Sequence, residues 1–265
     1  MIKQPQIINF YGLTFTNISK KELIDFSTEI VQSGQKKIFH GYSLMFLPKL
    51  KSNPNLLNYL QNIDHFLIDG RGIYLLLKFF GENVKEHISL PDFAEILLEL
   101  SNQNSFRVLL FGASEEINKK AKENVSKNYN NIELFGINGY FSEEDEEHIV
   151  DKINDIKADI ILIGISTPKK EKFTFDWANR INSKIIVHCG GVIDILAGKT
   201  RREPRIIKYL ALTWLYRLVL EPKRLFKIMI PNFFIIMFGL VPRIILNKLV
   251  RRKDFSIPNY FTKIK

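Results

Sequence analysis

The sequence predicts an α/β protein with a Rossmann-like, mostly parallel sheet, helices on both faces and a basic helical C-terminal appendage. Two patterns predict the sheet: apolar strand-like runs alternate with helical segments, and glycine turns follow several of these runs. A change of charge near residue 198 predicts the appendage. With 265 residues, 46% of them apolar, the chain is large enough for one substantial domain and an extension. We therefore divide it into a core of residues 1–198 and an appendage of residues 199–265.

The first part of the core has the strand-helix rhythm of such a sheet. Apolar runs of strand length stand next to segments with helical spacing of apolar residues. The expected elements are a strand in QIINFYGL (6–13), a helix from Lys20 to about Val31, a strand in KKIFHGY (36–42) and a helix through Leu50.

Residues 64–80, DHFLIDGRGIYLLLKFF, predict an apolar strand, a sharp Asp-Gly turn and a helix. The turn places Asp69 at the carboxyl end of a strand, where ligands bind in open α/β sheets. Asp69 is therefore a candidate catalytic carboxylate, although an isolated Asp-Gly pair is usually a turn with local hydrogen bonds only. Gly70 and Gly72 could begin a dinucleotide-binding fingerprint, but Leu75 stands where the third glycine belongs.

The remaining core segments continue the same alternation. FRVLLFGAS (106–114) predicts a buried strand that ends at Gly112, and Ser114 caps the next helix. The free N–H groups at such a helix start can hold a phosphate, so Gly112 is a candidate ligand contact. The other expected elements are a helix opened by Pro91, a strand in NIELFGINGYF (131–141), an acidic-fronted helix from Ser142, a strand in ADIILIGIS (158–166), a helix opened by Pro168 and a strand in KIIVHC (184–189).

The core ends in a segment that combines glycine turns with clustered cations. Gly190 and Gly191 follow the last apolar run, so the backbone can turn sharply there and approach a ligand closely. Asp194 stands near the start of a short helix. The cations and aromatic residues that follow are Arg201, Arg202, Arg205, Trp214, Tyr216, Arg217 and Arg224.

Charge separates the two parts of the chain and limits the classes of partner. Residues 1–198 contain 22 Lys and Arg against 25 Asp and Glu, whereas residues 199–265 contain 16 against 3, a net −3 followed by +13. A near-neutral core with a basic, aromatic and apolar appendage favours an anionic lipid surface over nucleic acid. The single cysteine, Cys189, excludes an intramolecular disulfide, and no secretory signal opens the sequence, so we expect a cytoplasmic protein.

Residues 228–242, IMIPNFFIIMFGLVP, form the most apolar stretch of the appendage. Pro231, Gly239 and Pro242 interrupt these fifteen uncharged residues, and a membrane-spanning helix needs about 20 apolar residues. We therefore expect segments that lie in the membrane interface, on the inner face of the cell membrane. A protein-protein docking surface is the alternative.

Several of these motifs, in this order, resemble the WecG/TagA/CpsF family, glycosyltransferase family 26. The resemblance rests on GGxxDxxxGxxxRxP from Gly190 to Pro204, followed by WLYRL and EPxR. It continues upstream through IDGRG, LPDFAEIL, NGYF and TPKKE, and so covers the chain to about Lys227. It implies an inverting transfer of a sugar from a UDP-sugar to a polyprenyl-diphosphate-linked sugar, in cell-surface polysaccharide biosynthesis.

The resemblance also assigns roles at the donor site. It makes Asp69 the base for the acceptor hydroxyl and places His87, Asp92, Lys170, Gly190 and Gly191 near the donor, where the helix start after Gly112 also makes Gly112 a donor-binding candidate. His87 stands where the family commonly has arginine, Lys170 where it has glutamine, and FHGYS (39–43) replaces its usual threonine and asparagine. The donor is then either of the N-acetylmannosamine type or an acidic sugar whose carboxylate pairs with Lys170. Asp92 either contacts the donor or only caps its helix.

Stabilisation of the departing diphosphate is expected to come from cations, with no metal and no cofactor. No Asp-x-Asp pair, the usual metal clamp of nucleotide-sugar transferases, occurs in the chain. Arg217, Arg224 and Lys227 would share one side of a nearly continuous helix, and Arg202 belongs to the family's RxP turn. Lys227 should be the weakest contact, because a guanidinium binds phosphate better than an ammonium.

Two other classes of function are compatible with the residues. A nucleotide-binding oxidoreductase would explain the Gly70-x-Gly72 turn, and a non-catalytic membrane adaptor would explain the departures at 39–43 and Lys170. The expected partners are a UDP-sugar donor, a polyprenyl-diphosphate-linked acceptor and an anionic membrane surface, without nucleic acid. Homo-oligomers are compatible with the sequence.

Overall fold

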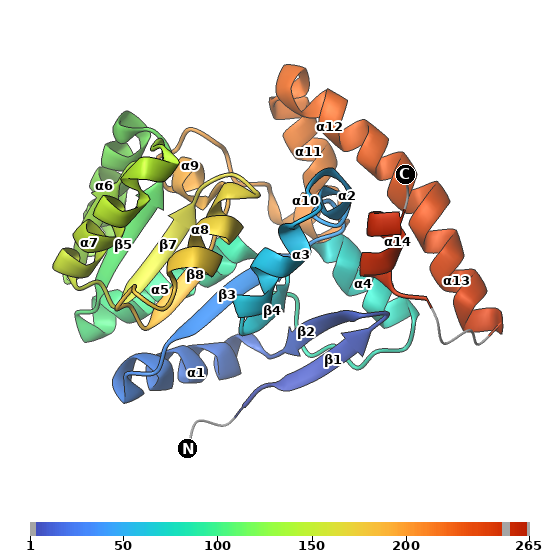
Figure 1. Ribbon diagram of the computed structural model, residues 1–265, viewed down its shortest axis with the longest axis horizontal. Coiled ribbons are helices and arrows are strands. Elements are labelled where there is room, and N and C mark those ends of the chain that lie inside the picture. The colour runs from blue at the N-terminus through green and yellow to red at the C-terminus, as the bar shows by residue number, and fades with distance from the viewer. Residues whose placement is uncertain (1–3, 251–254, 264–265) are drawn as a thin grey trace.

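The protein is described here by a computed structural model that covers residues 4–250 and 255–263, without the side chains of Arg205, Arg224 and Lys263. Its centre is a six-stranded parallel sheet with the strand order β4-β3-β8-β7-β5-β6 (Figure 1). The prediction of a Rossmann-like α/β sheet is confirmed. The strands are β3 (Lys37–Tyr42), β4 (His65–Ile68), β5 (Arg107–Gly112), β6 (Glu133–Ile137), β7 (Ile160–Gly164) and β8 (Ile185–His188).

Helices cover both faces of the sheet, because side chains alternate between the faces along each buried strand. On β5, Leu109 and Phe111 join one core cluster, whereas Val108 and Leu110 join the other. The first face is covered by α3 (Leu56–Tyr59), α7 (Glu146–Ile156) and α8 (Lys169–Trp177). The second is covered by α1 (Lys20–Ser33), α5 (Leu90–Asn104), α6 (Glu115–Asn128) and α9 (Val192–Leu196).

The N-terminus forms a hairpin where the sequence predicted a single strand. β1 (Gln6–Phe10) pairs antiparallel with β2 (Leu13–Asn17). Tyr11 and Gly12 make the turn with φ of 45° and 80°. Two consecutive residues with positive φ match the twist of a tight hairpin.

The helix expected through Leu50 is also shorter than predicted. Residues 44–48 form turns, and only α2 (Lys49–Ser52) is helical. Pro48 accounts for the late start, because a proline disfavours a helical conformation of the residue before it. The other short elements of the core are η1 (Leu60–Asn62), α4 (Arg71–Phe79) and η2 (Glu143–Asp145).

The appendage contains two helices where we expected one nearly continuous helix through Arg217, Arg224 and Lys227. α11 (Thr213–Leu220) and α12 (Pro222–Phe234) are separated by Glu221, whose φ of −131° and ψ of 57° are not helical. Pro222 explains the break, since it disfavours a helical Glu221. Trp214 at the start of α11 stacks on Phe233 at the end of α12, with ring centroids 4.8 Å apart, so the helices form an antiparallel pair.

The apolar segment of the appendage is continuous, and the prediction of interrupted segments is wrong. α12, the π-helix η3 (Ile235–Leu240) and α13 (Val241–Val250) follow one another without a break, with Pro231 inside α12 (Figure 1). The wider turns of a π-helix allow local changes in the hydrogen-bond ladder. The run Leu225–Val250 has 26 residues and contains an 18-residue window with a mean hydropathy of 2.0, so by length and composition it could cross a membrane.

The end of the appendage shares a hydrophobic core with the N-terminal part. Leu240 and Ile244 are fully buried, as are Ile257 and Phe261 of α14 (Ile257–Lys263). They belong to the cluster that contains Phe111 and Ile163 of the sheet. α10 (Arg205–Tyr209) precedes α11 and connects the sheet to the helix pair. A domain boundary at residue 198 remains a prediction.

Candidate active site

Asp69 lies directly after β4, at the carboxyl edge of the sheet. Its backbone N–H donates to the Tyr42 carbonyl at 3.0 Å, which continues the pairing of β3 and β4. Its Oδ1 accepts a hydrogen bond of 3.1 Å from the N–H of Leu90, the first residue of α5. Position 41 must be small, because a Cβ on Gly41 would lie 2.6 Å from the Asp69 Cβ. The carboxylate is therefore held at a helix N-terminus, which favours negative charge.

The surroundings of Asp69 raise its pKa above the ordinary aspartate value. Burial is the main cause, whereas the Leu90 N–H and the charges of Arg217 and Lys208 act in the opposite direction. Burial disfavours the charged carboxylate, so the group binds a proton more strongly than an exposed aspartate. A raised pKa makes Asp69 a better general base at neutral pH.

Cations from the appendage lie beside this carboxylate. Arg217 of α11 and Lys208 of α10 are close enough for their charges to lower the Asp69 pKa. Arg71, which begins α4, stacks between the rings of Tyr74 and Tyr209, with its guanidinium 4.9 and 4.8 Å from their centroids. Two cations of the appendage thus act on the Asp69 carboxylate, an arrangement suited to an anionic substrate.

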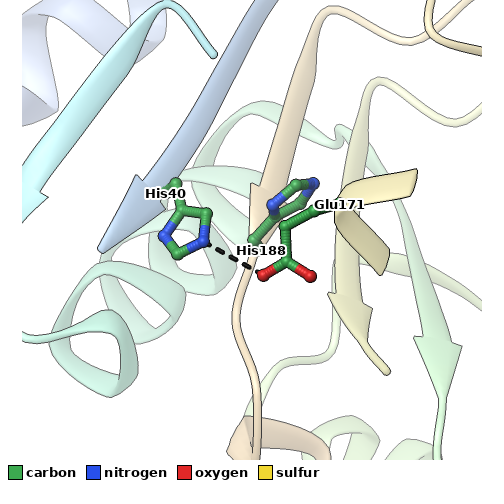
Figure 2. A group of neighbouring side chains, drawn as sticks. All are labelled: His40, Glu171 and His188. Carbon is green, nitrogen blue, oxygen red and sulfur yellow. Dashed lines mark hydrogen bonds and ion pairs between the residues drawn. The ribbon is translucent and has the colours of Figure 1, made fainter. Parts of the chain in front are cut away.

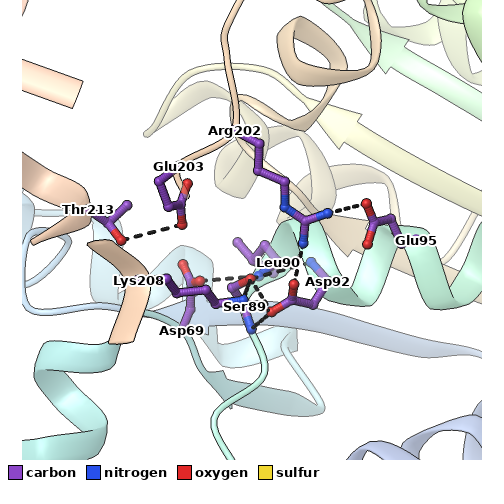
Figure 3. Close-up of polar contacts among 9 residues, drawn as sticks. All are labelled: Asp69, Ser89, Leu90, Asp92, Glu95, Arg202, Glu203, Lys208 and Thr213. Atoms are coloured by element: carbon purple, nitrogen blue, oxygen red, sulfur yellow. Dashed lines mark hydrogen bonds and ion pairs between the residues drawn. The ribbon is translucent and has the colours of Figure 1, made fainter. Parts of the chain in front are cut away.

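Asp92 links the appendage to the core (Figure 3). It is the third helical residue of α5 and forms a capping box with Ser89, whose hydroxyl donates to Oδ2 at 2.6 Å. Its carboxylate also pairs with Arg202 and Lys208, and Arg202 reaches Glu95 one turn further along α5. Burial alone would raise the Asp92 pKa, but Lys208, Ser89 and Arg202 together lower it.

These contacts show that Asp92 and Arg202 have structural roles, one of the alternatives that the sequence left open. Asp92 caps its helix, and both residues hold the segment from 199 to 212 against α5. A contact of either residue with substrate stays a prediction. A further polar contact joins this segment to α11: the Thr213 hydroxyl donates to a Glu203 carboxylate oxygen at 3.3 Å.

His87 lies near the same groups and is neutral at physiological pH. Burial lowers its pKa to about 4, and the nearby charge of Lys208 acts in the same direction. Its Nε2 is buried without a hydrogen-bond partner among the residues that the structure describes. His87 therefore does not replace the charge of an arginine, and its contact with a donor stays a prediction.

The glycines predicted to contact a ligand have different surroundings. Gly112 has a φ of 148°, and a Cβ there would lie 2.5 Å from the Gly164 carbonyl oxygen, so the packing of β5 against β7 alone requires glycine. Gly190 has a φ of 58° with open space around it, and Gly191 also faces open space. Of these three glycines, Gly190 and Gly191 leave room for a ligand to approach the backbone, and Gly112 does not.

Lys170 lies inside the protein, near the start of α8. Its side chain is 6% exposed, and its ammonium lies 2.6 Å from Glu171 Oε1 and 2.5 Å from the Thr167 hydroxyl. The ammonium is therefore paired within the protein, and pairing with a donor carboxylate stays a prediction. Of the remaining predicted cations, Lys227 is exposed on α12, and the side chain of Arg224 lies outside the described part of the structure.

Two residues of this site were not singled out from the sequence. Arg71 belongs to the IDGRG motif and follows Asp69 by two positions, so the motif itself contained the signal. Lys208 stands in the basic segment RIIKY, but nothing in that segment identifies Asp92, 116 positions earlier, as its partner. Together with Asp69 and Arg217 they place a buried carboxylate and several cations at the carboxyl edge of the sheet.

Comparison with known proteins identifies the kind of enzyme. The model of the glycosyl transferase WecG/TagA/CpsF family matches residues 8–252. The chain belongs to this family and is a glycosyltransferase. The resemblance seen in the sequence motifs is thereby confirmed.

Curated relatives carry a specific activity in their names. A protein of Staphylococcus aureus strain MRSA252 is 25% identical over 228 residues, which cover 82% of this chain and 86% of the relative. Proteins of strains NCTC 8325 / PS 47 and COL are 24% identical over the same lengths. All three are named N-acetylglucosaminyldiphosphoundecaprenol N-acetyl-beta-D-mannosaminyltransferase.

Proposed function

We propose that this protein transfers a sugar from a UDP-sugar to a sugar carried on polyprenyl diphosphate, in the synthesis of a cell-surface polysaccharide. The observation that carries the proposal is the position of Asp69, a carboxyl of raised pKa beside Arg217 and Lys208 at the carboxyl edge of the sheet. The names of the relatives support the acceptor, because they contain a lipid-linked N-acetylglucosaminyl diphosphate.

The residues around Asp69 suit an inverting transfer. Asp69 takes the proton of the acceptor hydroxyl as its oxygen attacks the anomeric carbon of the donor. The bond from that carbon to the diphosphate breaks, and UDP leaves with the bonding electrons. Negative charge grows on the departing diphosphate, and Arg217 and Lys208 stabilise it. Attack opposite the leaving group inverts the configuration at the anomeric carbon.

The donor that fits best is a neutral N-acetylhexosamine of the N-acetylmannosamine type. The relatives are named as N-acetylmannosaminyltransferases. An acidic donor needs a free cation for its carboxylate, and the ammonium of Lys170 is already bonded to Glu171 and Thr167. We therefore favour the neutral sugar over a uronic acid.

A transfer assay with the full chain tests the function. The protein is incubated with a synthetic lipid-diphosphate N-acetylglucosamine acceptor and a panel of UDP-sugars, and the products are identified by mass spectrometry. We expect transfer from UDP-N-acetylmannosamine at least tenfold faster than from a UDP-uronic acid. A faster rate with the UDP-uronic acid would indicate that Lys170 contacts the donor carboxylate. If the protein neither transfers nor hydrolyses any donor, a non-catalytic adaptor becomes the better interpretation.

We further propose that the continuous helical run Leu225–Val250, formed by α12, η3 and α13, lies along the inner surface of the membrane. Its Ile236, Leu240 and Ile244 are fully buried against the protein and follow one another at intervals of four. Phe234 and Phe238 lie on the opposite side and are 54% and 73% exposed. A helix with one side packed against its own protein exposes only the other to lipid, as interfacial helices do. The charge of +13 in residues 199–265 adds attraction to anionic headgroups.

Replacing Phe234 and Phe238 with serine should release the protein from vesicles of anionic phosphatidylglycerol. Each buried phenylalanine contributes about 1.5 kcal/mol, so the double variant should bind roughly 10²-fold more weakly in a sedimentation assay. High salt alone should release the wild-type protein only in part, because apolar burial is not screened. Ile7→Ser, which changes an apolar side chain 47% exposed on β1, is the control and should bind normally. Unchanged binding of the double variant would show that this face is not the membrane surface.

A further inference from the structure

A second group of polar side chains is buried on the first face of the sheet. His40 of β3, His188 of β8 and Glu171 of α8 point toward one another (Figure 2). All three are buried, and the atoms that they offer as metal ligands lie within 4.8 Å of one another. Two imidazoles and one carboxylate are a ligand set of zinc enzymes.

In each histidine one ring nitrogen is held by a group outside the cluster, and the other faces the cluster. Nδ1 of His40 lies 3.0 Å from the Gly41 carbonyl, which only accepts, so Nδ1 carries the proton. Nε2 of His188 lies 2.8 Å from the Thr174 hydroxyl. Metal-bound histidines have this arrangement, in which a hydrogen bond to one nitrogen orients the other toward the ion.

Two atoms of the group lack any partner in the part of the chain that the structure describes. They are Nδ1 of His188 and Oε2 of Glu171, both buried. A third atom, Nε2 of His40, lies 3.2 Å from Glu171 Oε1, an oxygen that the Lys170 ammonium and the Thr167 hydroxyl already contact. Buried polar atoms without partners are costly, and a bound ion would satisfy all three.

Lys170 contacts one of the two oxygens of the Glu171 carboxylate. Its ammonium and the Thr167 hydroxyl both contact Glu171 Oε1, at 2.6 and 2.9 Å. Oε2 remains available, so the two groups can orient the carboxylate as outer partners of an ion. The positive charges of Lys170 and of the nearby, partly buried Lys49 repel a bound cation. Removing the charge of Lys170 should therefore strengthen metal binding.

We propose that His40, Glu171 and His188 bind one divalent transition-metal ion of the zinc type, through Nε2, Oε2 and Nδ1 respectively. Zinc bonds of about 2.0–2.2 Å require the ligand atoms to approach one another by roughly 1 Å when the ion binds. The ion joins β3, β8 and α8, three elements that are distant in sequence.

The metal site is separate from the proposed base. Side chains alternate along β3, and a Cβ on Gly41 would meet Asp69, so His40 points to the opposite face of the sheet. The ion is therefore expected to stabilise the carboxyl edge of the sheet without contacting the acceptor hydroxyl. Its binding can be measured independently of glycosyl transfer.

The test is the metal content of the full chain, purified without chelators and measured by mass spectrometry. We expect about one zinc ion per chain, and after its removal a titration with Co²⁺ should give the visible absorption of a tetrahedral site. Added Zn²⁺ should raise the melting temperature of the stripped protein, because an ion that binds only the folded state stabilises it.

Variants distinguish this site from adventitious binding. His188→Ala and Glu171→Gln should abolish the Co²⁺ spectrum, whereas His148→Ala, an exposed histidine on α7, should leave it unchanged. Lys170→Gln removes the repelling charge and should bind Co²⁺ at least tenfold more tightly. If the wild-type protein takes up no stoichiometric ion, the Lys170 ammonium is the cation of the cluster and the proposal is wrong, whatever Lys170→Gln binds. The wild-type titration decides this even where a variant fails to fold.

Discussion

Asp69→Asn should lower the turnover number at least about 10²-fold, the usual loss when a general base is removed, while the protein stays folded. Asparagine has nearly the same shape, and its carbonyl oxygen can accept the Leu90 N–H that now reaches Oδ1. It cannot take the proton of the acceptor hydroxyl. The measurement is the transfer rate at saturating substrates, with UDP-sugar binding followed by calorimetry. Asp25→Asn, an exposed position on α1, is the matched control.

The pH dependence provides a second measurement of the same residue. A base must be unprotonated, so activity falls as the pH drops through the Asp69 pKa. Since burial raises that pKa, the acid limb of kcat/KM should lie above about pH 4, the value of an ordinary aspartate. The limb should disappear in Asp69→Asn. Near-normal turnover of this variant, or an unchanged acid limb, would remove Asp69 from the mechanism.

Sequence patterns such as apolar runs and helix caps predicted most of the core, because the structures that they indicate form within one helix or strand. Apolar runs such as ADIILIGIS became buried strands, and Ser114 caps α6 as expected, with its hydroxyl accepting from the Ile117 N–H. The hairpin was missed because its turn is Tyr11-Gly12 instead of the Asn-Gly or Asp-Gly pairs that usually mark such turns. The break between α11 and α12 was foreseeable from Glu221-Pro222, since the restriction before proline is local.

The candidate site was predictable only where a motif contained it. Asp69 follows a strand and precedes a glycine, and that pattern alone places it at the carboxyl edge of the sheet. The pairing of Asp92 with Lys208 and the approach of Arg217 to Asp69 depend on how α10 and α11 fold back on the core. The same is true of His40 and Glu171, which are 131 positions apart. Such contacts depend on tertiary packing, which the spacing of residues along the chain does not encode.

Arg217→Ala should lower the turnover number by about 10²- to 10³-fold, the range measured when one donor to a developing oxyanion is removed. Arg217→Lys should retain part of the rate, because an ammonium keeps the charge but loses the two-pronged contact with phosphate. Lys223→Ala, an exposed cation of the same helix pair, is the control and should keep its activity.

The same variant also decides which diphosphate Arg217 holds. If it stabilises the departing nucleotide, inhibition by UDP should weaken at least tenfold while KM for the lipid acceptor changes little, and the opposite split would assign it to the lipid diphosphate. The acid limb of the pH profile provides a check on proximity: the charge of Arg217 lowers the Asp69 pKa, so its removal should move the limb to higher pH. Full activity with an unmoved limb would place Arg217 outside the site.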